Sequence, residues 1–151
     1  MSAVEEAVLR FRAELAASPD RVFAALTQAG HLMRWFCDEC ESDARSGGHV
    51  WFKWIGPGAS PEPFTGTWDV VEAPRRCAFS GGHSGYPDGN GGRITFTLEA
   101  QGEGTAVVVE HAMPARVDYA PVAQKYTLAW PRALERLGEY LTPRDGTGSP
   151  A

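Results

Sequence analysis

The chain has 151 residues, of which 43% are hydrophobic and 22% are charged, and its formal net charge is -5 at pH 7. This composition suits one globular domain and excludes a disordered, collagenous or coiled-coil chain. The negative charge and the lack of a basic stripe argue against nucleic acid as a partner, because such binding depends on neutralising phosphates. No apolar run approaches the ~20 residues of a membrane span, and the first 15 residues do not resemble a signal peptide, so we expect a cytoplasmic protein.

The predicted elements begin with a half-buried strand and two short helices. Over residues 6–15, apolar and charged side chains alternate with a period of two, which is typical of a strand with one buried face. Ser18 and Pro19 suit the cap and the first position of a helix. We expect this helix to end at Gly30 and a second short helix to cover residues 31–36.

A succession of short strands follows, separated by turns rich in glycine and proline. The predicted strands cover residues 39–45, 49–55, 64–73, 76–81, 92–100 and 105–112. Short connections between successive strands favour an antiparallel meander with one buried face. Trp51 is out of phase with its apolar neighbours, so we expect it to be exposed, where it is a candidate contact for a homodimer.

The last predicted element is a long amphipathic helix over residues 122–141. An apolar stripe at helical spacing runs from Trp130 to Leu141. Pro131 lies inside this pattern, so we expect a kink or a restart of the helix there.

Together these elements predict an α+β domain over residues 1–142 and a disordered tail over residues 143–151. The domain is a seven-stranded, curved antiparallel sheet around the long C-terminal helix, with two short helices after the first strand. Since one helix covers the apolar face of a curved sheet, we expect a cavity between them, toward the end where the short helices lie.

Several stretches of the chain, in this order and spacing, resemble a known family. They are residues 18–36 (SPDRVFAALTQAGHLMRWF), the Gly47-Gly48 turn before an aromatic strand, and residues 66–80, 94–111 and 130–140. The pattern is similar to the START-like (SRPBCC) superfamily, whose members have the helix-grip fold. Within it, the chain is most similar to small domains related to the heat-shock protein 90 ATPase activator. Cys37 with Cys40, the long glycine-rich loop and Pro131 depart from the pattern.

The resemblance implies a fold and a cavity rather than a reaction. Members of the superfamily bind lipids, hormones or polyketides, and a minority catalyse cyclisation or hydrolysis. The co-chaperone role belongs to larger proteins with an additional domain, so we do not expect a chaperone partner.

We therefore expect the cavity to bind a small hydrophobic or aromatic molecule, without catalysis and without a cofactor. The candidate ligand-binding residues are rings on apolar strand phases and helix faces, with two polar groups to orient the ligand: Trp35, Phe52, Trp54, Trp68, Phe79, Phe96, His111, Tyr126 and Trp130. Small residues beside these rings, such as Gly66 and Cys77, fit either tight packing or a cavity.

Two alternatives from other functional classes stay open. His111 shares its strand phase with the buried Val107 and Val109, so an enzyme of the cyclase or hydrolase kind could use it as general base, with Tyr126 as its partner. A protein-interaction module of the co-chaperone kind would instead use the outer face of the sheet or the loop at residues 80–92.

Two further motifs are weak as functional signals. Cys37 and Cys40 form a CxxC pair, but no second pair and no histidines at ligand spacing accompany them, so we expect no metal site. Cys77 brings the cysteines to three, which argues against a disulfide framework. The glycine-rich loop at residues 80–92 lacks a nucleotide-binding motif. It could gate the cavity, although a disordered hairpin connection is the favoured prediction.

Overall fold

The computed structural model describes residues 5–142, so the predicted tail at residues 143–151 lies outside the described residues. In chain order the elements are β1 (Glu6–Leu15), α1 (Pro19–Thr27), α2 (Ala29–Trp35), β2 (Glu39–Ser42), β3 (His49–Lys53), β4 (Phe64–Glu72), β5 (Arg76–Gly82), β6 (Arg93–Gln101), β7 (Gly104–Pro114) and α3 (Ala120–Leu141). Two 3₁₀ turns, η1 (Pro87–Gly89) and η2 (Val117–Tyr119), lie in the connections around them. Within this part of the chain, no helix combines the length and the hydropathy needed to cross a membrane.

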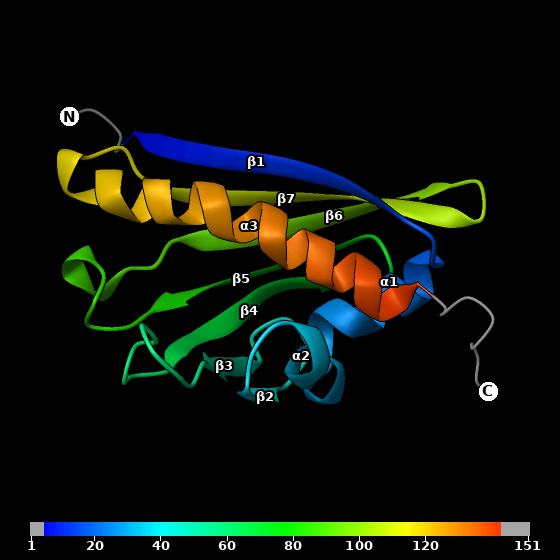
Figure 1. Ribbon diagram of the computed structural model, residues 1–151, viewed down its shortest axis with the longest axis horizontal. Helices are drawn as coiled ribbons and strands as arrows, with labels where there is room; N and C mark the ends of the chain where they lie inside the picture. Colours follow the sequence, from blue (N-terminus) through cyan, green and yellow to red (C-terminus); the bar gives the residue numbers. More distant parts are fainter. Residues whose placement is uncertain (1–4, 143–151) are drawn as a thin grey trace.

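The strands form one antiparallel sheet in the order β1-β7-β6-β5-β4-β3-β2. From β2 to β7 each strand pairs with the next one in the chain, and β1 pairs with β7 from Glu6 opposite Pro114 to Leu15 opposite Thr105. Figure 1 shows α3 crossing in front of the sheet, with α1 and α2 at one end. The predicted α+β helix-grip fold is therefore confirmed.

Alternation along the strands sets the two faces of the sheet. In β3, Val50 and Phe52 are buried against the helices, while Trp51 points to the opposite face. The sequence predicts an exposed Trp51, but its side chain is half-buried on that outer face. The homodimer contact that we expect there stays a prediction.

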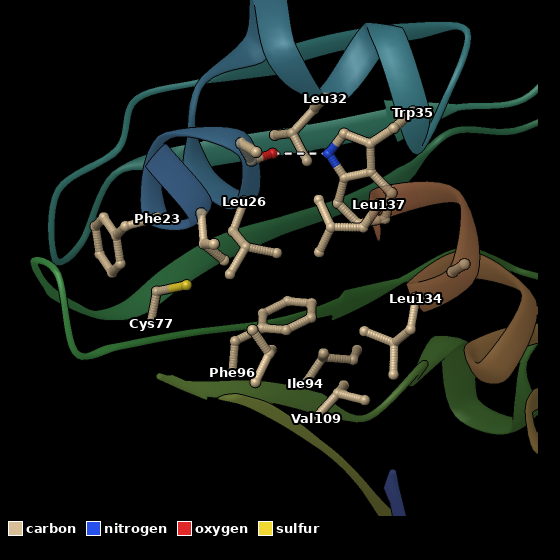
Figure 2. Close-up of a cluster of buried hydrophobic side chains, with 14 of the residues drawn as sticks. Phe23, Leu26, Leu32, Trp35, Cys77, Ile94, Phe96, Val109, Leu134 and Leu137 are labelled. Carbon is tan, nitrogen blue, oxygen red and sulfur yellow. Dashed lines mark hydrogen bonds between the residues drawn. The ribbon is translucent and has the colours of Figure 1, made fainter. Parts of the chain in front are cut away.

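One buried cluster of the core lies where α1 and α2 meet the C-terminal half of α3. Figure 2 shows Leu26, Trp35 and Leu137 gathered above Phe96 of β6. The indole nitrogen of Trp35 donates a hydrogen bond of 2.8 Å to the carbonyl of Ala25, so this ring is buried without an unpaired polar atom.

The boundary between the two short helices differs from the prediction. Ser18 does cap α1, accepting a backbone N–H of that helix at 3.4 Å. The helix ends at Thr27, because Gln28 is extended (φ -94°, ψ 132°) and its N–H still bonds to the last turn. The second helix begins at Ala29, so Gly30 lies in the first turn of α2 rather than at the end of α1.

The sequence predicts a kink or a restart of the C-terminal helix at Pro131, and no restart occurs. α3 is helical from Ala120 to Leu141 with Pro131 inside it. A proline at this position removes one N–H and frees the carbonyl of Thr127. Both residues are exposed, so water can solvate the freed carbonyl while the apolar stripe on the other side keeps its contacts.

Candidate ligand-binding cavity

A cavity of about 670 Å³ lies between the middle of α3 and the inner face of the sheet, with lining residues from each strand from β3 to β7. Rings of Phe52, Phe64 and Phe79 form its floor, and Tyr126 and Trp130 of α3 cover it. The connections after β3 and after β5 form its sides. Its volume falls within the roughly 300–1,000 Å³ that is usual for small-molecule sites.

The cavity is not at the end of the sheet where the sequence places it. Among the described residues that line it, only Phe36, the C-cap of α2, adjoins the two short helices. At the predicted end, Leu26, Trp35 and Leu137 fill the space between α1, α2 and α3 (Figure 2). The open space therefore begins beyond Phe36.

The predicted ligand-binding residues divide into two groups. Those that line the cavity are Phe52, Trp54, Phe79, His111, Tyr126 and Trp130. The other three, Trp35, Trp68 and Phe96, are buried elsewhere in the core. Trp68 is fully buried, and its indole nitrogen donates to the hydroxyl of Ser42 at 2.9 Å. These three rings stabilise the fold rather than form the cavity wall.

His111 is fully buried, and both of its ring nitrogens are occupied. Nε2 lies 2.7 Å from the carbonyl oxygen of Gly91, which can only accept, so Nε2 carries the proton. The indole N–H of Trp130 donates to Nδ1 at 3.0 Å, so Nδ1 carries none. Burial lowers the pKa of His111 below its ordinary value, and the ring is held neutral.

This geometry removes the general base of the enzymatic alternative. The one free lone pair of His111 accepts the Trp130 N–H and faces no open space for a substrate proton. The Tyr126 ring packs edge-on against the imidazole with 4.5 Å between ring centres, but its hydroxyl bonds to Tyr86 instead. The predicted pairing of His111 with Tyr126 is therefore wrong in its chemistry, although the two rings touch.

A pair of tyrosine hydroxyls ties the β5–β6 loop to α3 beside the cavity. The hydroxyls of Tyr86, in the loop, and Tyr126, in the helix, bond to each other. Burial raises the pKa of both phenols, so both stay neutral at ordinary pH. Tyr86 of this loop is thus part of the cavity wall.

The β5–β6 loop is held by further bonds and is not the disordered connection that the sequence favours. The hydroxyl of Tyr119 lies 2.9 Å from the carbonyl oxygen of Pro87 and 2.7 Å from that of Asn90. The backbone N–H and the hydroxyl of Ser84 donate to the two carboxylate oxygens of Glu62, at 2.9 and 2.7 Å. These bonds lower the pKa of Glu62 and join the loop to the β3–β4 connection.

Sequence reasoning misses part of the lining. Phe36, Ile55 and Phe64 escape it because they lie at or beyond the ends of regular elements, where periodicity gives no signal. Three basic side chains of α3 also line the cavity: Lys125, Arg132 and Arg136. The helical spacing that reveals the apolar stripe of α3 could have identified these as its neighbours.

The cysteines lie outside the cavity. Strand β2 begins after Cys37, whose thiol donates to the carbonyl of Leu32 at 3.7 Å, and both Cys37 and Cys40 are buried. Hydrogen bonding with Cys40, together with burial, raises the pKa of Cys37. Burial raises the pKa of Cys77, in β5, to about 12. Across residues 5–142, no three His, Cys, Asp or Glu side chains converge in a way that could hold a metal ion.

Known proteins share this architecture. A family model described as Activator of Hsp90 ATPase homolog 1-like protein matches residues 16–142. The chain belongs to this family. The match confirms the resemblance drawn from the sequence, and a search of the curated proteins finds no match.

Solved structures share the fold of this family member. Protein MLL2253 from Mesorhizobium loti is 18% identical with a TM-score of 0.77, and the alignment covers 89% of this chain and 96% of that chain. The Aha1 dimer from Colwellia psychrerythraea is 20% identical with a TM-score of 0.74, at the same coverages of 89% and 96%. CalU16 from Micromonospora echinospora is 25% identical with a TM-score of 0.69, covering 94% of this chain and 88% of that chain. These likenesses show that the helix-grip fold described above is shared with solved proteins.

Proposed function

We propose that this protein binds a small hydrophobic or aromatic molecule in the cavity between α3 and the sheet, without catalysing a reaction on it. The observation that carries the proposal is a cavity of about 670 Å³ walled by aromatic rings. Phe36 is central to this wall, because it packs edge-on against Phe52 and Trp54 at 5.1 and 5.3 Å between ring centres and lies stacked beside Trp130 at 6.1 Å.

The free energies expected for such a ligand are those of reversible binding. Burying about 200 Å² of apolar ligand surface contributes about 5 kcal/mol, and contact with the rings adds about 0.5–1.5 kcal/mol for each good pair. Association then costs several kcal/mol of translational and rotational freedom. For a ligand of two or three rings the balance is about 2–5 kcal/mol, which corresponds to a dissociation constant in the millimolar range.

A binding role is favoured over an enzymatic one because the side chains of the wall that could act as a general base already accept hydrogen bonds. His111 accepts the Trp130 N–H, and His83 accepts the N–H of Gly85 at its Nδ1 at 2.9 Å. Glu62 accepts from Ser84 with both carboxylate oxygens. Among the described lining residues, these two histidines and this carboxylate are the side chains suited to take a proton near neutral pH.

A substitution that fills the cavity with a side chain tests the proposal. We expect the neutral fluorophore N-phenyl-1-naphthylamine to bind the wild-type protein saturably. Ala129→Phe places a ring in the cavity and should abolish this binding, while Gln124→Phe, on the exposed side of the same helix, should leave it unchanged. Near-ultraviolet circular dichroism confirms that both variants keep the fold. No saturable binding to the wild type, or equal binding to both variants, would overturn the proposal.

A further inference from the structure

Three basic side chains of α3 line the same side of the cavity. Lys125, Arg132 and Arg136 are separated by seven and four residues, so they form one stripe along the helix. This stripe runs beside the apolar one that contains Trp130 and Ala133. The chain as a whole is acidic, with a net charge of -5, so the cavity is a local reversal of sign.

These three cations have no carboxylate partner in the part of the chain that the structure describes. The salt bridges there are made by other arginines. Arg132 and Arg136 are four residues apart on one helix face, where like charges repel each other. Glu135, which lies between them in the sequence, lines a separate groove beside β1 instead.

The rest of the cavity wall offsets at most one of these three charges. Glu62 is the carboxylate among the described lining residues, and Ser84 engages both of its oxygens. His83 is held neutral, because burial lowers its pKa. The ammonium of Lys125 lies 5.9 Å from the ring centre of Tyr126, which places one cation directly beside the aromatic wall.

We propose that the cavity takes an amphipathic anion: an aromatic or hydrophobic body inside, and a carboxylate, sulfonate or phosphate at the mouth beside Lys125, Arg132 and Arg136. This inference rests on the proposed function and names the class of molecule that the cavity binds. The planar guanidinium is suited to paired hydrogen bonds with such groups. The anion would also relieve the repulsion between the two arginines.

The experiment uses two probes that differ by one charged group, a sulfonate. 8-Anilinonaphthalene-1-sulfonate is N-phenyl-1-naphthylamine with one added sulfonate, so a fluorescence titration of both isolates the charged group. We expect the wild-type protein to bind the sulfonate about tenfold more tightly, as two or three partly exposed ion pairs would give. The double variant Arg132→Gln with Arg136→Gln should lose about that factor for the sulfonate and keep its affinity for the neutral probe.

Arg34→Gln is the matched control, because Arg34 is an exposed arginine of α2 outside the cavity. It should leave both titrations unchanged, and salt should weaken the binding of the sulfonate alone. Equal affinity of the wild type for the two probes, or equal loss of both in the double variant, would overturn this inference and leave the proposed function standing. No saturable binding of either probe would overturn the proposed function itself.

Discussion

Acidification should destabilise this protein through His111. In the folded state its Nδ1 accepts the Trp130 N–H, and its Nε2 donates to the carbonyl of Gly91. Protonation would set a second N–H against the indole N–H and would place a charge in a fully buried site. In the unfolded chain the same imidazole is free and titrates near its ordinary pKa of 6.5.

The sign and size of the effect follow from this difference. Because the pKa of His111 in the folded state is lowered, the unfolded chain takes up the proton first as the pH falls. The contribution of His111 to the free energy of unfolding is therefore complete above about pH 6.5 and is lost toward the lower, folded-state pKa. One proton gives a slope of at most about 1.4 kcal/mol per pH unit.

The variant His111→Gln isolates this contribution. Glutamine can donate to the carbonyl of Gly91 but leaves the Trp130 N–H without its acceptor, so the variant should lose about 1–3 kcal/mol at about pH 7.5. Urea unfolding followed by tryptophan fluorescence, at about pH 7.5, 6.5 and 5.5, measures both proteins. The gap between them should narrow by up to about 1.4 kcal/mol per pH unit as the pH falls. Free energies that decline in parallel would refute the claim that His111 is held neutral, since His83 is present in both proteins.

Three further predictions test the packing and the loop. Gly81→Ala should lower Tm strongly, because a Cβ there would overlap the carbonyl of Thr65 in the paired strand. In Gly30→Ala the new Cβ meets nothing within 4 Å, so the free energy of unfolding should rise by about 0.5 kcal/mol. Equal values of Tm for the two variants, measured by circular dichroism, would contradict this prediction. Tyr119→Phe should cost about 1–3 kcal/mol and accelerate amide hydrogen exchange in the β5–β6 loop, since the Tyr119 hydroxyl shares its one proton between two loop carbonyls. Unchanged exchange would show that another contact orders the loop. Trp35→Phe should cost about 2–3 kcal/mol in urea unfolding, because it frees a buried carbonyl of α1 and leaves a gap; a change under about 0.5 kcal/mol would contradict the packing in Figure 2.

The fold could be predicted because its signals are local in the chain. Alternation and turn residues set the order of the strands, and the spacing of apolar residues identifies α3. The position of the cavity could not be predicted, because it depends on which strands each part of α3 faces. Phe79 and Phe96 are both buried on the inner face of the sheet, yet of these two only Phe79 lines the cavity. Phe96 instead packs edge-on against Trp130.

The hydrogen-bond partners of His111 could not be predicted for a similar reason, since they lie far away in the chain. The strand phase correctly predicts that His111 points inward, but not what its nitrogens meet. Its partners Gly91 and Trp130 lie 20 and 19 residues away in the chain, one in a loop and one in a helix. The order of the β5–β6 loop likewise depends on Tyr119 and Glu62, so its glycine content alone points to mobility that the structure does not show.

Two of the contacts that hold the β5–β6 loop differ in how much free energy it costs to break them. Parting the hydroxyls of Tyr86 and Tyr126 leaves two partly buried phenols that incoming water can solvate. Releasing Gly91 from His111 would strand a carbonyl and an imidazole in a dry interior, which costs far more free energy. The tyrosine pair is therefore the less costly of these two contacts to break, so we expect any widening of the cavity to begin beside Tyr86 while Gly91 stays bonded to His111.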